Sequence, residues 1–192
     1  MDTEMLGYLR LLGLFILVLV LAGMLVYLLY LVVRQIAVRL SPKIFISYRR
    51  SDSADVTGRI YEHLAHRFSK AGIFLDVSSI PPAADFPALI QEKIAHSRLM
   101  LVIIGPQWAS ITGQDGERRL TNPSDFVHQE VAGALAQPIP VIPVLVSGAE
   151  MPGAAQLPDD LKALATKNAV RIRPEPDFKA DITNLIHAIQ QL

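Results

Sequence analysis

The segment KIFISYRRSD, Lys43 to Asp52, decides the fold of this chain. A short apolar strand, Ile44 to Ile46, runs into a tyrosine, two adjacent arginines and a Ser-Asp turn. The strand therefore ends by presenting cations and a hydroxyl group at a loop. Parallel α/β sheets bind ligands at this place, outside the carboxyl ends of their strands. The segment predicts an α/β sheet with an anion site at the end of its first strand.

Residues 43–192 alternate predicted strands with predicted helices, which favours a parallel sheet covered by helices on both faces. The strands are expected at 44–48, 73–76, 99–104, 141–146 and 169–172, and the helices at about 55–70, 86–97, 122–137, 157–165 and from 177. Pro143 interrupts the fourth strand, which weakens that prediction or places the strand near the sheet edge. Asn122 is expected to cap the third helix, with Pro123 at its first position.

The excess of apolar residues lies at the amino terminus. The mean hydropathy is +0.34, and Leu11 to Val33 contains no charged residue between Arg10 and Arg34. A helix of this length crosses the roughly 30 Å hydrocarbon core of a bilayer. The sequence predicts an amino-terminal segment 1–10, a transmembrane helix 11–33, a juxtamembrane linker 34–42 and one domain at 43–192.

The flanking charges set the expected orientation. Arg34, Arg39 and Lys43 follow the span, whereas only Arg10 precedes it, so the positive-inside rule places the domain in the cytoplasm and the amino terminus outside. A cleaved signal peptide is the alternative, but it would have a shorter apolar region and a basic start.

Several function classes are excluded. The chain has no cysteine, so disulfides, thiolate zinc sites and a cysteine nucleophile are absent. Removing Arg10, Asp2 and Glu4 from 18 basic and 18 acidic residues leaves 17 and 16, a balance that argues against nucleic-acid binding. No phosphate-binding GxxxxGK[ST] or nucleophile-elbow GxSxG occurs. His63 and His66 have no third ligand nearby, and we expect no metal site.

The segment DFVHQEVAGAL, Asp125 to Leu135, places one carboxylate on a mostly apolar helix. Val127, Val131 and Leu135 belong to its core stripe, and Glu130 lies about 100° from Val131, at the boundary of that stripe. Such a carboxylate could enter a cleft. The alternative is an exposed helix glutamate.

The combination of FISYRR, DFVHQE and VIPVLV-x4-MP resembles the Toll/interleukin-1 receptor (TIR) family, in particular its NAD-cleaving members. The resemblance covers 43–192 and implies a flavodoxin-like fold with a five-stranded parallel sheet. DFVHQE matches the family pattern D-aromatic-V-basic-x-E, which implies that Glu130 is the catalytic glutamate. It further implies a membrane-anchored NAD glycohydrolase that releases nicotinamide and ADP-ribose or a cyclic derivative, with NAD as substrate and no cofactor, acting in bacterial antiphage defence or cell suicide.

The resemblance also implies a substrate pocket. Tyr48, Arg49 and Arg50 would lie along the nicotinamide and ribose-phosphate side, because guanidinium groups bind pyrophosphate well. The alternative is a surface pair that solubilises the loop or contacts the membrane. Ser51 either joins this site or caps the next helix.

Five aromatic and acidic residues complete the expected site. Phe126 and Trp108 either stack on a ring of the ligand or belong to the core, and Asp125 either lines the site or caps the helix. Asp76 and the loop through Phe86 would mediate contacts between domains and help to gate the pocket. Ala83 stands in this loop where relatives often have glycine, which puts the gating role in doubt.

A non-enzymatic reading remains open. Family members also act as signalling modules that assemble through contacts between TIR domains, and homotypic assembly is expected for either function.

Overall fold

The computed structural model describes residues 3–40, 43–75 and 86–192, and divides the chain into two compact units, Met1–Ser41 and Pro42–Leu192. The loop 76–85, including Asp76 and Ala83, lies outside the described residues. Phe86 begins a helix, but its side chain is not among those described.

The first unit is one helix, α1 (Thr3–Leu40). Its segment Gly13–Val33 is long and apolar enough to cross a membrane. The helix continues to Leu40, so residues 34–40 of the expected linker are helical. This segment contains no glycine or proline to end a helix.

The second unit contains a five-stranded sheet with the order β2-β1-β3-β4-β5. All neighbouring strands are parallel, which confirms the expected flavodoxin-like fold. The strands are β1 (Ile44–Ser47), β2 (Ile73–Leu75), β3 (Leu99–Ile104), β4 (Val141–Val146) and β5 (Val170–Ile172). In this order the switch point lies between β1 and β3, where such sheets bind ligands.

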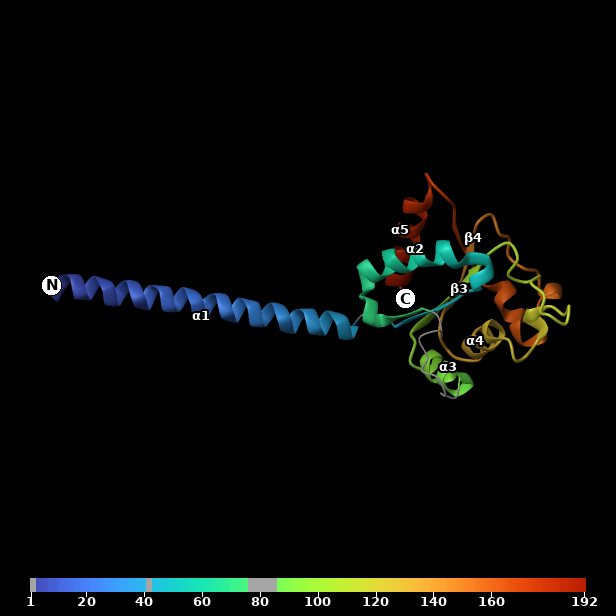
Figure 1. The fold of residues 1–192 in the computed structure, drawn as a ribbon, viewed down its shortest axis with the longest axis horizontal. Coiled ribbons are helices and arrows are strands. Elements are labelled where there is room, and N and C mark those ends of the chain that lie inside the picture. The colour runs from blue at the N-terminus through green and yellow to red at the C-terminus, as the bar shows by residue number, and fades with distance from the viewer. Residues whose placement is uncertain (1–2, 41–42, 76–85) are drawn as a thin grey trace. The chain divides into compact units, whose positions relative to one another are not determined.

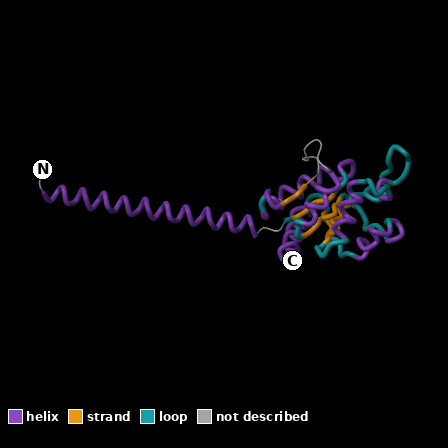
Figure 2. The backbone as a smooth tube through the Cα atoms, turned by 90° about the horizontal axis from the view of Figure 1, so that it is seen from below, coloured by secondary structure: helices purple, strands orange, loops and turns teal. Residues whose placement is uncertain are grey.

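Helices cover both faces of the sheet, as Figure 1 shows. The helices α2 (Arg50–Phe68) and α5 (Phe178–Gln190) share one core with the sheet. The helices α3 (Phe86–Ala95) and α4 (Phe126–Leu135) share the other, together with the 3-10 helix η5 (Asp159–Thr166). Shorter 3-10 helices are η1 (Lys70–Gly72), η3 (Arg119–Thr121) and η4 (Ala154–Gln156). The strands form the centre of this unit (Figure 2).

Alternation along β3 explains the two cores. Leu99, Leu101 and Ile103 pack on the α2 and α5 side, and Met100, Val102 and Ile104 pack on the α3 and α4 side. Successive side chains of a strand point to opposite faces, so a continuous apolar run is buried on both sides, as is typical of a central parallel strand.

The structure forms β4 over Val141–Val146 and places it between β3 and the edge strand β5, near the sheet edge as expected. Pro143 pairs with Val102 of β3, but β5 pairs with β4 only from Val144 onward. Pro143 therefore has a strand neighbour on one side only. This is the edge-like condition under which a strand tolerates proline.

The structure also corrects the start of α4, which begins at Phe126 rather than at Pro123. The N-cap is Asp125, whose side chain accepts a hydrogen bond from the backbone N–H of His128. The Asn122 side chain instead accepts one from Ser124 N–H, at 2.8 Å, and so stabilises the turn before the helix.

Candidate functional site

A buried hydrogen bond joins the end of β1 to α4. Ser47 is the last residue of β1 and shares the strand face of Phe45, which packs in the α3 and α4 core. Its hydroxyl donates to Glu130 Oε2 at 2.6 Å. Ser47 is fully buried and Glu130 is 5% exposed. The exposed-glutamate alternative therefore does not describe this structure.

Beside this pair, a buried ion pair joins the β1–α2 loop to the first residue before α4. Arg49 donates from both terminal nitrogens to the Asp125 carboxylate, at 3.1 and 3.0 Å, and from Nε to the carbonyl oxygen of Trp108 at 2.9 Å. Both charged side chains are 2% exposed. A bidentate pair of this kind fixes orientation as well as charge, so Arg49 holds the β1 end, the turn after β3 and α4 together.

A second arginine bonds the same carboxylate. Arg119 Nε donates to Asp125 Oδ2 at 3.0 Å, and its side chain is 45% exposed. One carboxylate therefore faces two guanidinium groups and the N-cap amide of His128. The cluster of Arg49, Arg119 and Asp125 has a net positive charge at the amino end of α4.

His128 anchors the other side of α4. Its Nδ1 lies 2.6 Å from the carbonyl oxygen of Leu120, and its Nε2 lies 2.8 Å from Asp160 Oδ2 on η5. The helix turn that carries Glu130 is thus tied to η3 and η5.

The structure separates the other expected site residues into two groups. Arg50 and Ser51 are exposed at the start of α2, and Phe126 is 45% exposed at the start of α4. Tyr48 is half-buried against the α2 and α5 core, on the strand face opposite Ser47. Trp108 is 1% exposed within the α3 and α4 core. As placed, its ring is covered by core side chains and offers no surface for stacking.

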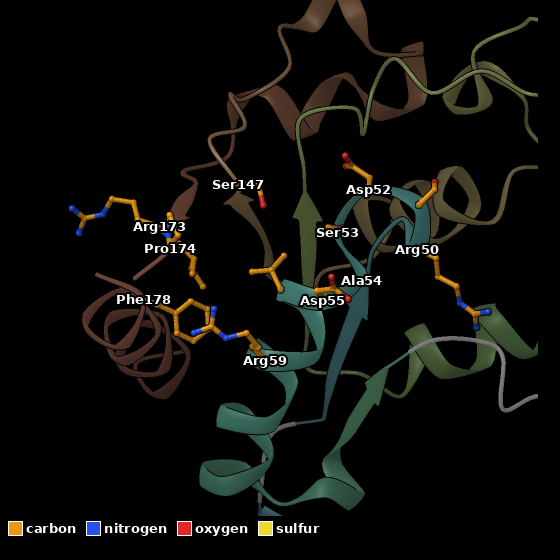
Figure 3. A pocket seen from close by; sticks show the side chains of 13 residues that line it. Arg50, Asp52, Ser53, Ala54, Asp55, Arg59, Ser147, Arg173, Pro174 and Phe178 are labelled. Carbon is orange, nitrogen blue, oxygen red and sulfur yellow. The ribbon is translucent and has the colours of Figure 1, made fainter. Parts of the chain in front are cut away.

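Three cavities lie at or near the carboxyl edge of the sheet. The first, of ≈ 400 Å³, lies between α2, the β4 end and α5, and its lining includes Arg50, Arg59 and Phe178. In this cavity Arg59 extends over the ring of Phe178, 3.8 Å from its centroid, whereas Arg50 points away from that pair (Figure 3). Arg59 also bonds Glu175 at 2.5 Å, so its charge is already compensated.

The second and third cavities both reach Arg119. One, of ≈ 390 Å³, includes Asp115, Glu117 and Phe126 in its lining. The other, of ≈ 540 Å³, is lined by Ser51, Gln107, Ser110, Ile111, Thr112 and Arg119. The exposed candidates Ser51 and Phe126 therefore lie on different sides of Arg119.

Sequence reasoning missed two residues of this site. Ser47 lies in the predicted strand 44–48, where successive side chains point to opposite faces of the sheet. Ser47 therefore shares a face with Phe45, and it could have been predicted as a site residue once α4 was assigned to that face. Arg119 lies in a polar insertion, 111–121, that has no regular periodicity. No sequence signal brings it to Asp125.

Comparisons with known proteins agree with this architecture. The family model described as TIR domain matches residues 44–186. The NAD(+) hydrolase sarm1 of Drosophila melanogaster is 28% identical over 131 residues, 66% of this chain, and the match spans 9% of that protein's length.

A solved structure shows the same fold at low sequence identity. The TIR domains of the activated Roq1 resistosome, which directly recognises the pathogen effector XopQ, match with a TM-score of 0.58 and 16% identity. That match covers 78% of this chain and 99% of the Roq1 chain. A metazoan TIR-STING receptor from C. gigas in complex with 2',3'-cGAMP gives a TM-score of 0.48 at 15% identity, over 74% of this chain and 38% of that one. Because the family model covers most of the chain and the sheet has the matching topology, this protein belongs to the TIR domain family.

Proposed function

We propose that this protein is an NAD glycohydrolase in which Glu130 is the catalytic carboxylate. The observation that carries the proposal is the buried Ser47–Glu130 pair at the switch point of the sheet. The distant similarity to an NAD(+) hydrolase supports the substrate class. The products would be nicotinamide and ADP-ribose or a cyclic derivative.

One carboxylate is chemically sufficient for this reaction. Most glycosidases need a second carboxyl group to protonate the leaving oxygen. Nicotinamide instead leaves as a neutral molecule from a cationic pyridinium, so the departing nitrogen needs no proton. The remaining requirement is a fixed negative charge beside the ribose, where positive charge develops in the transition state. The Ser47 hydroxyl bonds Oε2 and thereby orients the other oxygen of Glu130.

The apolar helix α1 supports a membrane location for the proposed enzyme. Gly13–Val33 would anchor the chain in a membrane, with the amino terminus outside and 43–192 in the cytoplasm, where NAD is present. In intact cells, a protease added from outside should then spare the domain. Digestion of the domain under these conditions would contradict both the orientation and access to cytoplasmic NAD.

The test of the activity uses the full chain reconstituted in lipid nanodiscs and incubated with NAD, with release of nicotinamide as the readout. Glu130→Gln should lower the rate at least ~100-fold, because it removes the charge that serves the transition state. Glutamine keeps an oxygen that can accept from Ser47, so thermal unfolding should change little. A chain that assembles but releases no nicotinamide would favour the non-enzymatic signalling module instead.

A further inference from the structure

The third cavity has the donor set of an anion site. Its six lining residues provide one guanidinium, one amide and three hydroxyl groups, and no carboxylate. They come from the start of α2, the turn after β3 and the insertion 111–121, all beyond the carboxyl ends of β1 and β3. Hydroxyl and amide groups can donate to phosphate oxygens, and arginine binds phosphate through two parallel bonds. We call this cavity the Arg119 groove.

Arg119 is held in one orientation while part of it stays accessible. Its Nε bonds Asp125, which is itself buried and fixed by Arg49. Within the described part of the chain, nothing bonds the two terminal nitrogens of Arg119. The bond from Nε therefore fixes the orientation of the guanidinium group, and the two terminal nitrogens can donate to a ligand.

Charge distinguishes this groove from the cavity on the other side of Arg119. The neighbouring cavity is lined by three carboxylates, from Asp115, Glu117 and Asp125, and by the two guanidinium groups of Arg118 and Arg119, so negative charge is in excess there. Among the described residues, Arg119 is the only charged residue that lines the groove. A phosphate group is therefore favoured on the groove side.

The arginine beside the first strand is less suited to this role. Arg49 uses Nε and both terminal nitrogens in bonds to Trp108 and Asp125. It would have to leave a buried ion pair before binding pyrophosphate, and breaking a buried pair is costly.

The groove and Glu130 are connected through α4. Asp125, which holds Arg119, precedes Glu130 by five residues, or about 7–8 Å of helix rise. The geometry points to the Arg119 groove as the site that binds the diphosphate of NAD while Glu130 faces the ribose to be cleaved. This inference rests on the function proposed above and adds the residue that recognises the phosphate.

A comparison of two substrates distinguishes phosphate binding from cleavage of the bond to nicotinamide. NAD and nicotinamide riboside share the bond to be cleaved, but the riboside has no phosphate. In the full chain in nanodiscs, Arg119→Gln should raise the KM for NAD about 10–100-fold, the range for losing charge-assisted hydrogen bonds. Cleavage of the riboside should change less than about twofold. Arg119→Lys keeps the charge but not the two parallel donors of the guanidinium group. Its KM for NAD should therefore lie between those of the wild type and Arg119→Gln.

Arg118→Gln is the matched control. Arg118 is adjacent, has the same charge and bonds the carbonyl oxygen of Gln156, but it does not line the groove. Its loss should leave the KM for NAD within about twofold, because Arg118 lies outside the groove lining and its exposed charge is weakened by salt screening. An unchanged KM in both Arg119 variants, or an equal rise in Arg118→Gln, would overturn the inference.

A direct binding measurement distinguishes failure of the groove from failure of the proposed function. If the wild-type chain cleaves neither substrate, calorimetry with inorganic pyrophosphate decides. Binding that Arg119→Gln abolishes and Arg118→Gln retains would support the groove, although the NAD hydrolase proposal would have failed. Equal binding by the wild type and Arg119→Gln, or none by the wild type, would refute the groove.

Discussion

Ser47 and Glu130 are separated by 83 positions in the sequence, yet their side-chain oxygens lie 2.6 Å apart. Within the described residues, the serine hydroxyl bonds only this carboxylate. In the proposed reaction it is a positioning residue, since it acts on the ribose only through Glu130. Its removal should affect turnover more than substrate affinity.

We therefore predict that Ser47→Ala lowers kcat about tenfold or more with little change in KM, because the carboxylate loses its orientation. The unpaired oxygen should also reduce the free energy of unfolding by about 1–3 kcal/mol. Steady-state kinetics and the fluorescence of Trp108, the single tryptophan, measure the two effects.

Ser97→Ala is the matched control for this prediction. Ser97 is 5% exposed and donates to the carbonyl oxygen of Lys93 at 2.7 Å, at the far end of α3. It should cost stability without changing kcat. If both variants lower kcat in proportion to their stability, Ser47 is only a structural residue.

The sequence predicts those site residues that lie in segments with helical or strand periodicity. Glu130 was identified by resemblance, and its boundary position on α4 was predicted from helical spacing. Its hydrogen bond could not be predicted, because it depends on how closely β1 and α4 approach in space. The resemblance implies that Arg49 contacts the substrate, whereas the structure buries its guanidinium group against Asp125. Only the fold brings Asp125 to it.

At the scale of elements, the Arg49–Asp125 pair is the main link between the β1 end and α4. Asp125→Asn would leave the Arg49 guanidinium buried without a countercharge. We expect a loss of about 3–5 kcal/mol in the free energy of unfolding, as for other broken buried pairs. Urea unfolding of the reconstituted chain, followed by Trp108 fluorescence, measures this loss.

The control for Asp125 is an exposed aspartate that pairs with a lysine. Asp159 bonds Lys162 at 2.5 Å, but its side chain is 94% exposed. Asp159→Asn should change stability by less than about 0.5 kcal/mol. Equal effects of the two variants would mean that the buried pair contributes no more than a surface pair.

A second link, between β5 and α5, predicts a pH dependence. The side chain and the backbone N–H of Arg173 both donate to Asp181, and these bonds lower the pKa of Asp181 below its ordinary value of 3.8. The group therefore stabilises the fold above that value. The contribution is lost as the pH falls below it, through the lower pKa of the folded state.

We predict that Asp181→Asn is less stable than the wild type at neutral pH and that the difference shrinks as the pH falls below 3.8. Asparagine resembles the protonated acid, so the two proteins converge once Asp181 is protonated. Urea unfolding at a series of pH values measures the difference. A gap that stays constant down to the acid limit would show that the charge of Asp181 is not responsible.

For the whole molecule, the exposure of Glu130 bears on how the proposed enzyme is activated. In the single chain the residue is only 5% exposed, so NAD can reach it only if this edge of the sheet rearranges. Contact with a neighbouring domain could stabilise the rearranged state. A membrane helix would favour such contacts, because tethering in one layer raises the effective concentration of the domains.

We therefore predict that the specific activity of the full chain in liposomes rises with the protein-to-lipid ratio, as nicotinamide release from NAD will show. Adding the Glu130→Gln chain to sparse wild-type protein provides the control, since this partner supplies the surface but no catalytic carboxylate. It should raise the activity of each wild-type chain even though it is inactive alone. A specific activity that stays constant across ratios and mixtures would show that one domain is a complete enzyme, and α1 would then serve only to place it at the membrane.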